Sequence, residues 1–342
     1  MKEPLISIVI VNWNGLRFLK GCFESIYSQG FKPLEVIFVD NGSTDSSVEF
    51  VSRNFPSALI IENTENAGFA RANNQGIKMA TGKYVLTLNN DTVLERGFLS
   101  ELAGAAEGSN EKTGMWAVKI LSFDERDVID SVGGLLIYPD GLAKGRGRLE
   151  KDSGQYDMAE EVFIPSACAG LYRRTMLDEV GLFDEDFFAY CEDTDLGLRA
   201  RLAGWRAANV PKAVVYHYYS GTGGRYTAFK AYLVERNHLW VALKNFPPLL
   251  LALFPLFTGW RLIMQVYGIF AGKGAGGRFV EGFSRTELIK VFFKAYLGAF
   301  GSLPAVLFKR RAIQKKRTVA SKEVLSWFRT YGISAKELVL KD

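Results

Sequence analysis

Short apolar runs that alternate with helical patterns constrain the fold of this chain more than any other feature. Four runs are predicted to be strands, at 5–11, 34–40, 58–63 and 83–90, and the first two are apolar almost throughout, which is typical of strands buried on both faces. The segments between them carry apolar residues at helical spacing. Strands that alternate with helices predict right-handed crossovers, and therefore an α/β fold with a mostly parallel sheet flanked by helices.

Polar clusters follow three of these strands: NWNG at 12–15, DNGSTD at 40–45 and NNDT at 89–92. In a parallel sheet, ligands bind beyond the carboxyl ends of the strands. The three clusters are therefore predicted to meet at one edge of the sheet and to form a binding site there.

Three residues near this edge have both a functional and a structural interpretation. Asp40 can accept a hydrogen bond from the ring N–H of a bound base, or it can form an Asx turn before the next helix. Arg71, on a helix predicted over 70–80, can reach a phosphate or a base, or it can be a solvated side chain. Asp91 supplies a single carboxylate of the kind that holds Mg²⁺ or Mn²⁺ beside a diphosphate, or it caps the following helix.

A second group of ionisable residues lies further along the chain. Glu192, Asp193 and Asp195 stand at a predicted helix start, where carboxylates favour the helix dipole and where one of them can also act as a general base. His217 ends a strand predicted over 213–217, and it is either a buried, hydrogen-bonded histidine or a second metal ligand.

Two loop regions interrupt the regular pattern. The stretch from about 120 to 165 is rich in Gly and charge, and its PDG sequence at 139–141 predicts a hairpin. The loop SGTGGR at 220–225 suggests a mobile lid with Arg225 aimed at phosphate. No Gly-x-Gly-x-x-Gly follows the first strand, which argues against a nucleotide-dependent dehydrogenase.

The overall composition narrows the class of protein. The 342 residues include 42 basic and 37 acidic side chains, a balance too even for a general nucleic-acid-binding protein. Cys22, Cys168 and Cys191 have neither disulfide nor metal-ligand spacing, which is typical of a reducing compartment. The apolar run near the N-terminus is too short for a signal peptide, so we expect a cytoplasmic protein.

The last third of the chain is predicted to be helical and apolar. The segment 249–270 is about long enough to span a bilayer, but it contains Arg261, and the segment 291–308 is also interrupted. Six basic residues follow within 309–317. We expect helices that lie in the interface of an anionic membrane; a helical subdomain packed on the catalytic core is the alternative.

Six blocks of this sequence, taken in order, closely resemble family 2 inverting glycosyltransferases of the GT-A fold, and most closely their bacterial rhamnosyltransferase-like members. The blocks are SIVIVNWNG, VIFVDNGSTDSS, NAGFARANNQGI, YVLTLNNDT, ACAGLYRRTMLDEVGLFDEDFFAYCEDTDLGLRARLAGW and AVVYHYYSGT. The resemblance implies a GT-A catalytic domain over 1–240, followed by a helical, membrane-interfacial region over 241–342.

The resemblance also implies a role for particular residues. Donor binding is implied for Asn12, Asp40, Arg71 and Asn90. Binding of Mg²⁺ or Mn²⁺ is implied for Asp91 and His217. Asp193 is implied as the catalytic base, with Glu192 as the alternative. The family's Asp-x-Asp-like motif reads Asn-Asn-Asp in this chain, so that a single acid remains at the metal position.

The resemblance implies transfer of a sugar with inversion of its anomeric configuration, and rhamnose or another deoxysugar is the preferred candidate. The donor would be a deoxythymidine- or uridine-diphosphate sugar, and the acceptor a hydroxyl of a lipid-linked glycan in cell-surface polysaccharide synthesis. The protein would then be peripheral on the inner face of the cell membrane. The alternative is a non-catalytic, membrane-associated binding protein on a degenerate transferase fold. Acceptor choice is expected to depend on the loops 122–162 and 218–228.

Overall fold

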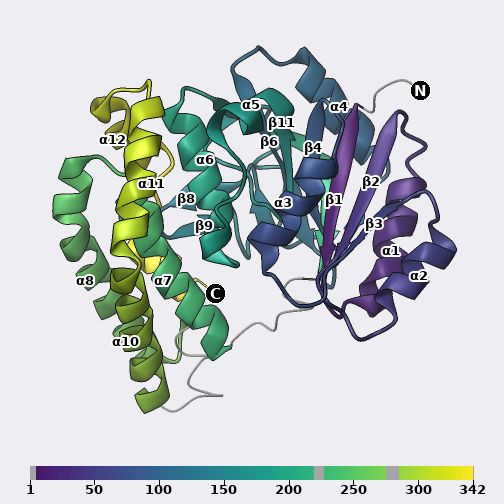
Figure 1. Cartoon of the computed structure of the whole chain (residues 1–342). Helices are drawn as coiled ribbons and strands as arrows, with labels where there is room; N and C mark the ends of the chain where they lie inside the picture. Colours follow the sequence, from purple (N-terminus) through teal and green to yellow (C-terminus); the bar gives the residue numbers. More distant parts are fainter. Residues whose placement is uncertain (1–4, 219–226, 275–284, 342) are drawn as a thin grey trace. The chain divides into compact units, whose positions relative to one another are not determined.

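The computed structural model describes residues 5–218, 227–274 and 285–341, and these form two compact units (Figure 1). The sheet unit comprises Met1–Leu135, Gly145–Ala200 and Trp205–Gly223, and the helical unit comprises Leu136–Lys144, Arg201–Gly204 and Gly224–Asp342. The loop at 220–225, with Arg225, lies outside the described residues.

A mixed sheet forms the centre of the sheet unit, in the order β10-β12-β6-β11-β4-β1-β2-β3, with β5 beside β12 and β7 beside β6. Its strands are β1 (Ile6–Asn12), β2 (Leu34–Asp40), β3 (Leu59–Glu62), β4 (Tyr84–Asn89), β5 (Thr92–Leu94), β6 (Thr113–Ser122), β7 (Ile129–Val132), β10 (Glu161–Val162), β11 (Ala169–Arg173) and β12 (Arg206–His217). From β12 to β3 every strand runs in the same direction except β11, which is antiparallel to both β4 and β6. The predicted mostly parallel α/β sheet is confirmed.

Helices cover both faces of this sheet. They are α1 (Leu16–Tyr27), α2 (Ser47–Asn54), α3 (Phe69–Met79), α4 (Phe98–Gly108), α5 (Arg174–Val180) and α6 (Glu192–Leu202). On one face, Ile8 and Ile10 of β1 join a buried cluster with Phe23 of α1. On the other face α3 lies so close that a Cβ at Gly76 would be 2.4 Å from the Val9 side chain. Because both sides of β1 are covered, its sequence is apolar almost throughout.

The helical unit contains α7 (Ala228–Asn245), α8 (Pro248–Ala271), α10 (Arg285–Gly301), α11 (Leu303–Lys316), α12 (Ser321–Thr330) and α13 (Ala335–Leu340). The predicted domain limit at residue 240 falls inside α7. Within the described residues, α8 is the one helix long and apolar enough to cross a membrane. The segments Ile289–Gly301 and Leu303–Lys316 meet that criterion only as a pair, with a bend of 59° between them.

The predicted hairpin at 139–141 is confirmed, and it belongs to the helical unit. Its strands are β8 (Leu135–Ile137) and β9 (Ala143–Gly145). The Tyr138 N–H donates to the Leu142 carbonyl across the turn, at 2.8 Å. Gly141 has a φ of +95°, and a Cβ there would lie 2.4 Å from the carbonyl oxygen of His238 in α7. The turn therefore requires glycine both for its backbone conformation and for its close approach to α7.

Candidate active site

The predicted polar clusters do meet at the carboxyl edge of the sheet. Asn12 lies opposite Asp40 in the register of β1 and β2, and Val11 lies opposite Asn89 in the register of β1 and β4. The Asn12 amide donates to the Asp40 carboxylate at 3.1 Å, and the Asn90 amide donates to the Asn12 side-chain oxygen at 2.6 Å. These side chains form a buried row across the ends of three strands.

Asp40 makes the Asx turn that its sequence favours. One of its carboxylate oxygens accepts from the backbone N–H of Ser43 at 2.8 Å, while the other accepts from Asn12. The Ser43 hydroxyl in turn accepts from the Asn12 amide and from the Asn14 N–H. The carboxylate is thus held in place before any ligand arrives, and its predicted contact with a base stays a prediction.

Asn41 organises the loop that leads into α3, and its role was missed by the sequence analysis. Its amide donates to Asn66 at 2.9 Å, and its side-chain oxygen accepts from the N–H of Ala67 at 3.0 Å. This loop presents Arg71, which is exposed on the first turn of α3. No sequence signal links Asn41 to a loop that lies 25 residues away, because the contact exists only once β2 and α3 are adjacent.

Asp91 and His217 face each other at the ends of neighbouring strands. The pairing of β5 with β12 places Thr92 opposite His217, and the Tyr218 N–H donates to the Asp91 carbonyl at 3.0 Å. As a result, His217 Nε2 lies 3.3 Å from a carboxylate oxygen of Asp91. Asp91 does not cap a helix, because β5 follows it and the residue before α4 is Gly97.

Asp130 of β7 completes this group, and it was not predicted from the sequence. Its carboxylate lies 2.7 Å from His217 Nδ1 and also pairs with Arg148. Burial opposes protonation of His217, but contacts with Cys168, Asp130 and Asp91 raise its pKa well above the usual value. In the neutral ring, the carboxylate at Nδ1 favours the tautomer with its proton on Nδ1, and this is the form that offers Nε2 as a metal ligand.

The donor set of Asp91 and His217 fits a divalent cation that also binds substrate. Mg²⁺ and Mn²⁺ commonly take one or two protein ligands and complete their coordination with water and substrate phosphates. Among the described residues, no group of three His, Cys, Asp or Glu side chains is arranged to hold a metal ion. The pair is therefore suited to a cation that is shared with a diphosphate, rather than to a fully protein-bound ion.

Asp193 and Glu192, at the start of α6, differ in how their charge is supported. The Asp193 carboxylate accepts from the N–H of Ala167 at 3.2 Å and from the N–H of Thr194 at 2.7 Å. Glu192 is buried, and one of its carboxyl oxygens has no hydrogen-bond partner among the described residues. Burial raises the pKa of Asp193, and the two hydrogen bonds oppose this rise. The pKa of Glu192 is raised well above its usual value by burial and by the charge of Asp193. The negative charge of Asp193 is therefore better stabilised by hydrogen bonds than that of Glu192. Asp195, the third carboxylate of this group, forms an ion pair with Arg199 at 2.9 Å.

The start of β11 connects the two halves of the site. Because β11 is antiparallel to β4, its first residue, Ala169, lies opposite Leu88 near the carboxyl end of β4. The preceding residue, Cys168, contacts His217 and accepts from the Asn89 N–H at 2.8 Å. Ala167, one residue earlier, donates to Asp193. The structure thus brings the predicted metal ligands and the predicted base to one edge of the sheet.

Comparison with known proteins adds independent information. The model of the family "Glycosyl transferase family 2" matches residues 7–181. The chain is 30% identical over 225 residues to the uncharacterized glycosyltransferase YwdF of Bacillus subtilis, covering 65% of this chain and 77% of that protein. It is 26% identical over 258 residues to the N-acetylglucosaminyl-diphospho-decaprenol L-rhamnosyltransferase of Mycobacterium tuberculosis, covering 65% and 78%.

Solved structures share the fold at low sequence identity. One is the mannosyltransferase PcManGT of Pyrobaculum calidifontis, in complex with GDP-Man and Mn²⁺, with a TM-score of 0.52, 19% identity, and coverage of 97% of this chain and 88% of that one. Another is GalNAc-T7 with UDP, GalNAc and Mn²⁺, with a TM-score of 0.59, 16% identity, and coverage of 74% and 50%.

Proposed function

This chain belongs to glycosyl transferase family 2, and from that premise we propose that it is a metal-dependent, inverting glycosyltransferase. The donor is a nucleoside-diphosphate sugar, and the acceptor is a hydroxyl group. The observation that carries the proposal is that Ala167 and Cys168 contact Asp193 on one side and His217 on the other, with Asp91 3.3 Å from His217. A transferase of this kind needs a diphosphate site and a base near the same anomeric carbon.

The row of Asn12, Asp40 and Asn90 is assigned to the nucleoside of the donor. Asp40 accepts from a ring N–H of the base, and the amides of Asn12 and Asn90 are suited to ribose hydroxyls. Arg71 on α3 is assigned to the base or the phosphates, because a guanidinium binds phosphate in a bidentate manner. Hydrogen bonds within the row hold these side chains before the donor binds, so that little order is lost on binding.

Asp91 and His217 are assigned to the divalent cation, Mg²⁺ or Mn²⁺. When bound, this cation offsets the negative charge that develops on the leaving diphosphate. Asp91 supplies the carboxylate oxygen, and His217 supplies Nε2 while Asp130 holds its other ring nitrogen at 2.7 Å.

Asp193 is assigned as the general base. It removes the proton from the acceptor hydroxyl, and the oxygen then forms a bond to the anomeric carbon as the bond to the diphosphate breaks. A single displacement from the side opposite the leaving group inverts the configuration. Glu192 is less suited to this role, because burial and the charge of Asp193 raise its pKa well above the usual value, and one of its carboxyl oxygens has no hydrogen-bond partner among the described residues.

The finer assignment is a rhamnose or other deoxysugar donor and a lipid-linked glycan acceptor, as in cell-surface polysaccharide synthesis on the inner face of the membrane. It is supported by the 26% identity to the mycobacterial rhamnosyltransferase, whose name includes a decaprenol-linked acceptor. The apolar helix α8 supports a membrane location.

A panel of nucleoside-diphosphate sugars tests the proposal. The melting temperature of the full chain is measured with deoxythymidine-, uridine- and guanosine-diphosphate sugars, in Mn²⁺ and in EDTA. We expect one nucleotide to stabilise the protein in Mn²⁺ only, and Asp91→Asn to lose that stabilisation. Donor binding without any turnover would instead favour a non-catalytic binding protein, and absence of binding to every donor would contradict the proposal.

A further inference from the structure

The longest helix of the helical unit has a surface that its own unit leaves uncovered. Along the 24 residues of α8 there is one charged side chain, Arg261. Leu256, Trp260, Ile263 and Phe270 are all more than half exposed, and they recur at helical spacing along one side of α8. Exposed apolar residues on soluble proteins are usually scattered singly, whereas a contiguous apolar face like this one is typical of an interaction site.

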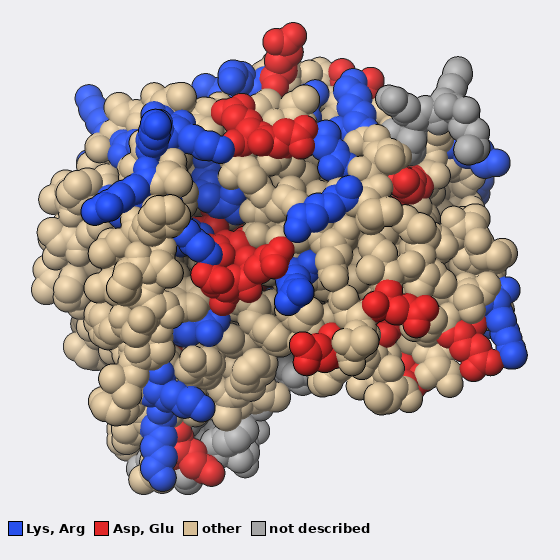
Figure 2. Space-filling view, viewed as in Figure 1, with Lys and Arg blue, Asp and Glu red and all other residues tan. Residues whose placement is uncertain are grey.

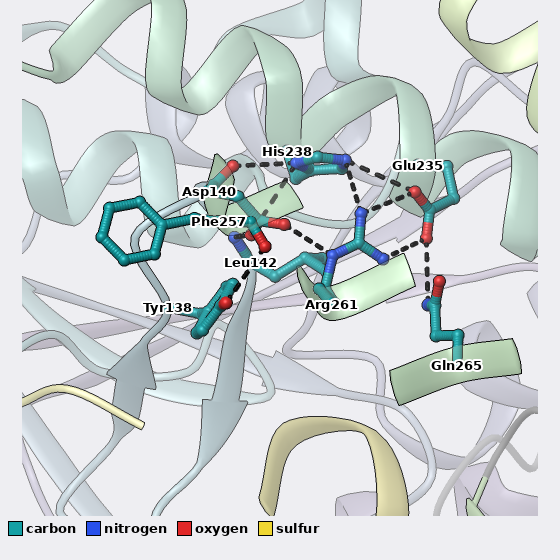
Figure 3. A network of polar contacts seen from close by, with 8 residues as sticks. All are labelled: Tyr138, Asp140, Leu142, Glu235, His238, Phe257, Arg261 and Gln265. Atoms are coloured by element: carbon teal, nitrogen blue, oxygen red, sulfur yellow. Dashed lines mark hydrogen bonds and ion pairs between the residues drawn. The ribbon is translucent and has the colours of Figure 1, made fainter. Parts of the chain in front are cut away.

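The opposite side of α8 is fixed to the rest of the unit by Arg261. This side chain is fully buried, and it donates to Asp140 of the hairpin at 2.5 Å and to both carboxylate oxygens of Glu235 in α7, at 2.8 and 2.9 Å. Figure 3 shows that His238 and Gln265 border the same cluster. The arginine that makes α8 look unsuited to a membrane therefore points into the protein.

This anchor argues against a membrane-spanning α8. Arg261 lies near the middle of the helix, so a spanning α8 would place it, and with it Asp140 and Glu235, at the depth of the hydrocarbon. The same movement would carry the charged residues of α7 into the bilayer, because α7 is joined to α8 by that ion pair. Charged groups at this depth are costly. An α8 that lies flat exposes only its apolar face to lipid.

The charges of the helical unit identify the kind of surface that α8 would meet. Residues 285–317, which include α10 and α11, contain nine Lys and Arg and a single acidic residue, Glu287. Figure 2 shows that the surface over α8, at the left edge, carries almost no charge, whereas basic side chains gather above it over α11 and α12. An apolar face beside basic residues is complementary to an anionic lipid surface.

We propose that α8 docks in the plane of an anionic lipid bilayer, with Leu256, Trp260, Ile263 and Phe270 in the lipid and Arg261 locked inside the protein. This inference rests on the proposed membrane location and specifies its geometry: one leaflet is entered, and no segment of α8 crosses to the other side. Trp, Phe and Leu are typical of the apolar face of a helix that lies in the membrane interface.

Vesicle binding of the full chain tests the surface. Cosedimentation is measured with vesicles of phosphatidylcholine alone and of phosphatidylcholine with roughly one third phosphatidylglycerol, which gives the vesicle a negative surface potential. We expect binding to the anionic vesicles, weakened at least about tenfold by the double variant Leu256→Glu/Ile263→Glu. Met158→Glu, at an exposed apolar residue of the sheet unit, is the matched control and should bind like the original chain. Equal binding of the double variant to the anionic vesicles would overturn the proposal. It would also be overturned if the original chain does not bind the vesicles but forms a dimer that the double substitution disrupts.

The depth of the two helix ends tests the orientation. Spin labels are placed on cysteines at Leu249 and Phe270, both exposed and about 32 Å apart along the helix. In-plane docking predicts similar depths for both labels, whereas labels at opposite surfaces of the bilayer would show a span and refute the proposal. Donor-dependent stabilisation of the double variant is measured in parallel. Its retention separates a failure of membrane docking from a failure of the proposed transferase activity.

Discussion

Arg261→Met should strongly destabilise the helical unit. The guanidinium makes three hydrogen bonds of 2.5–2.9 Å to Asp140 and Glu235, and all three side chains are buried. Methionine fills much of the same space but leaves two carboxylates without their cation. Removal of one partner from a buried ion pair costs about 3–5 kcal/mol, and we expect a loss of this size in the free energy of unfolding.

The loss should depend on pH in a direction that identifies its cause. Burial alone would raise the pKa of Glu235, but the charge of Arg261 and hydrogen bonds from His238 and Arg261 hold it well below its usual value. In the original chain this carboxylate stabilises the fold above its unfolded pKa, and the contribution disappears as the pH falls through the folded value. In Arg261→Met burial dominates and the pKa rises above the unfolded value. The penalty should then be smaller at pH 5.5 than at pH 7.5.

Hydrogen exchange of α7 measures this effect within the helical unit itself. The triple variant Asp140→Asn/Glu235→Gln/Arg261→Met removes all three charges and should regain most of the loss. Arg206→Met breaks an exposed ion pair with Glu161 and should cost less than about 1 kcal/mol. A loss below about 1 kcal/mol in Arg261→Met, or one that grows as the pH falls, would refute the reasoning.

Three further predictions concern the site. Asp193→Asn should retain donor binding and lose about 10²–10⁴-fold in turnover; near-normal turnover measured with saturating donor would exclude it as the base. Asp130→Asn should weaken Mn²⁺ binding in the presence of nucleoside diphosphate by about 10–100-fold in calorimetry, while Asp127→Asn, at an exposed carboxylate, should leave it unchanged. Gly68→Ala should cost at least about 1–3 kcal/mol in thermal unfolding, because Gly68 has a φ of +86° and a Cβ there would lie 2.6 Å from the Phe188 carbonyl oxygen. Gly181→Ala, at nearly the same φ and ψ but with no atom closer than 3.7 Å to the added Cβ, should cost less, and equal losses would argue against the steric explanation.

The parallel half of the sheet could be predicted because its signal is local. Residues 5–11 and 34–40 are apolar on both sides, and the polar groups that follow them mark the edge at which a ligand binds. The reversed direction of β11 could not be predicted, since ACAGLYRR shows no direction. That reversal is what brings Ala167 to Asp193 and Cys168 to His217.

Contacts between distant segments explain why some site residues could not be predicted from the sequence. Asp130 reaches His217 only because β7 pairs with β6, which in turn pairs with β12. The hairpin was predicted from PDG, but its place in the helical unit is set by contacts with distant residues, such as the hydrogen bond from Arg261 to Asp140, 121 residues apart. The cost of a charge within α8 was recognised from the sequence, whereas the ion pairs that offset it required the structure.

The configuration of the released sugar distinguishes an inverting transferase from a retaining one. Slow hydrolysis of the preferred donor by the full chain in Mn²⁺ can be followed by proton NMR, which detects the anomer formed first before it equilibrates. For inversion with Asp193 as the base, we expect the inverted anomer to appear first, and Asp193→Asn to slow its formation by about 10²–10⁴-fold while the donor still binds. First formation of the retained anomer would rule out inversion, and an undiminished rate in Asp193→Asn would rule out Asp193 as the base.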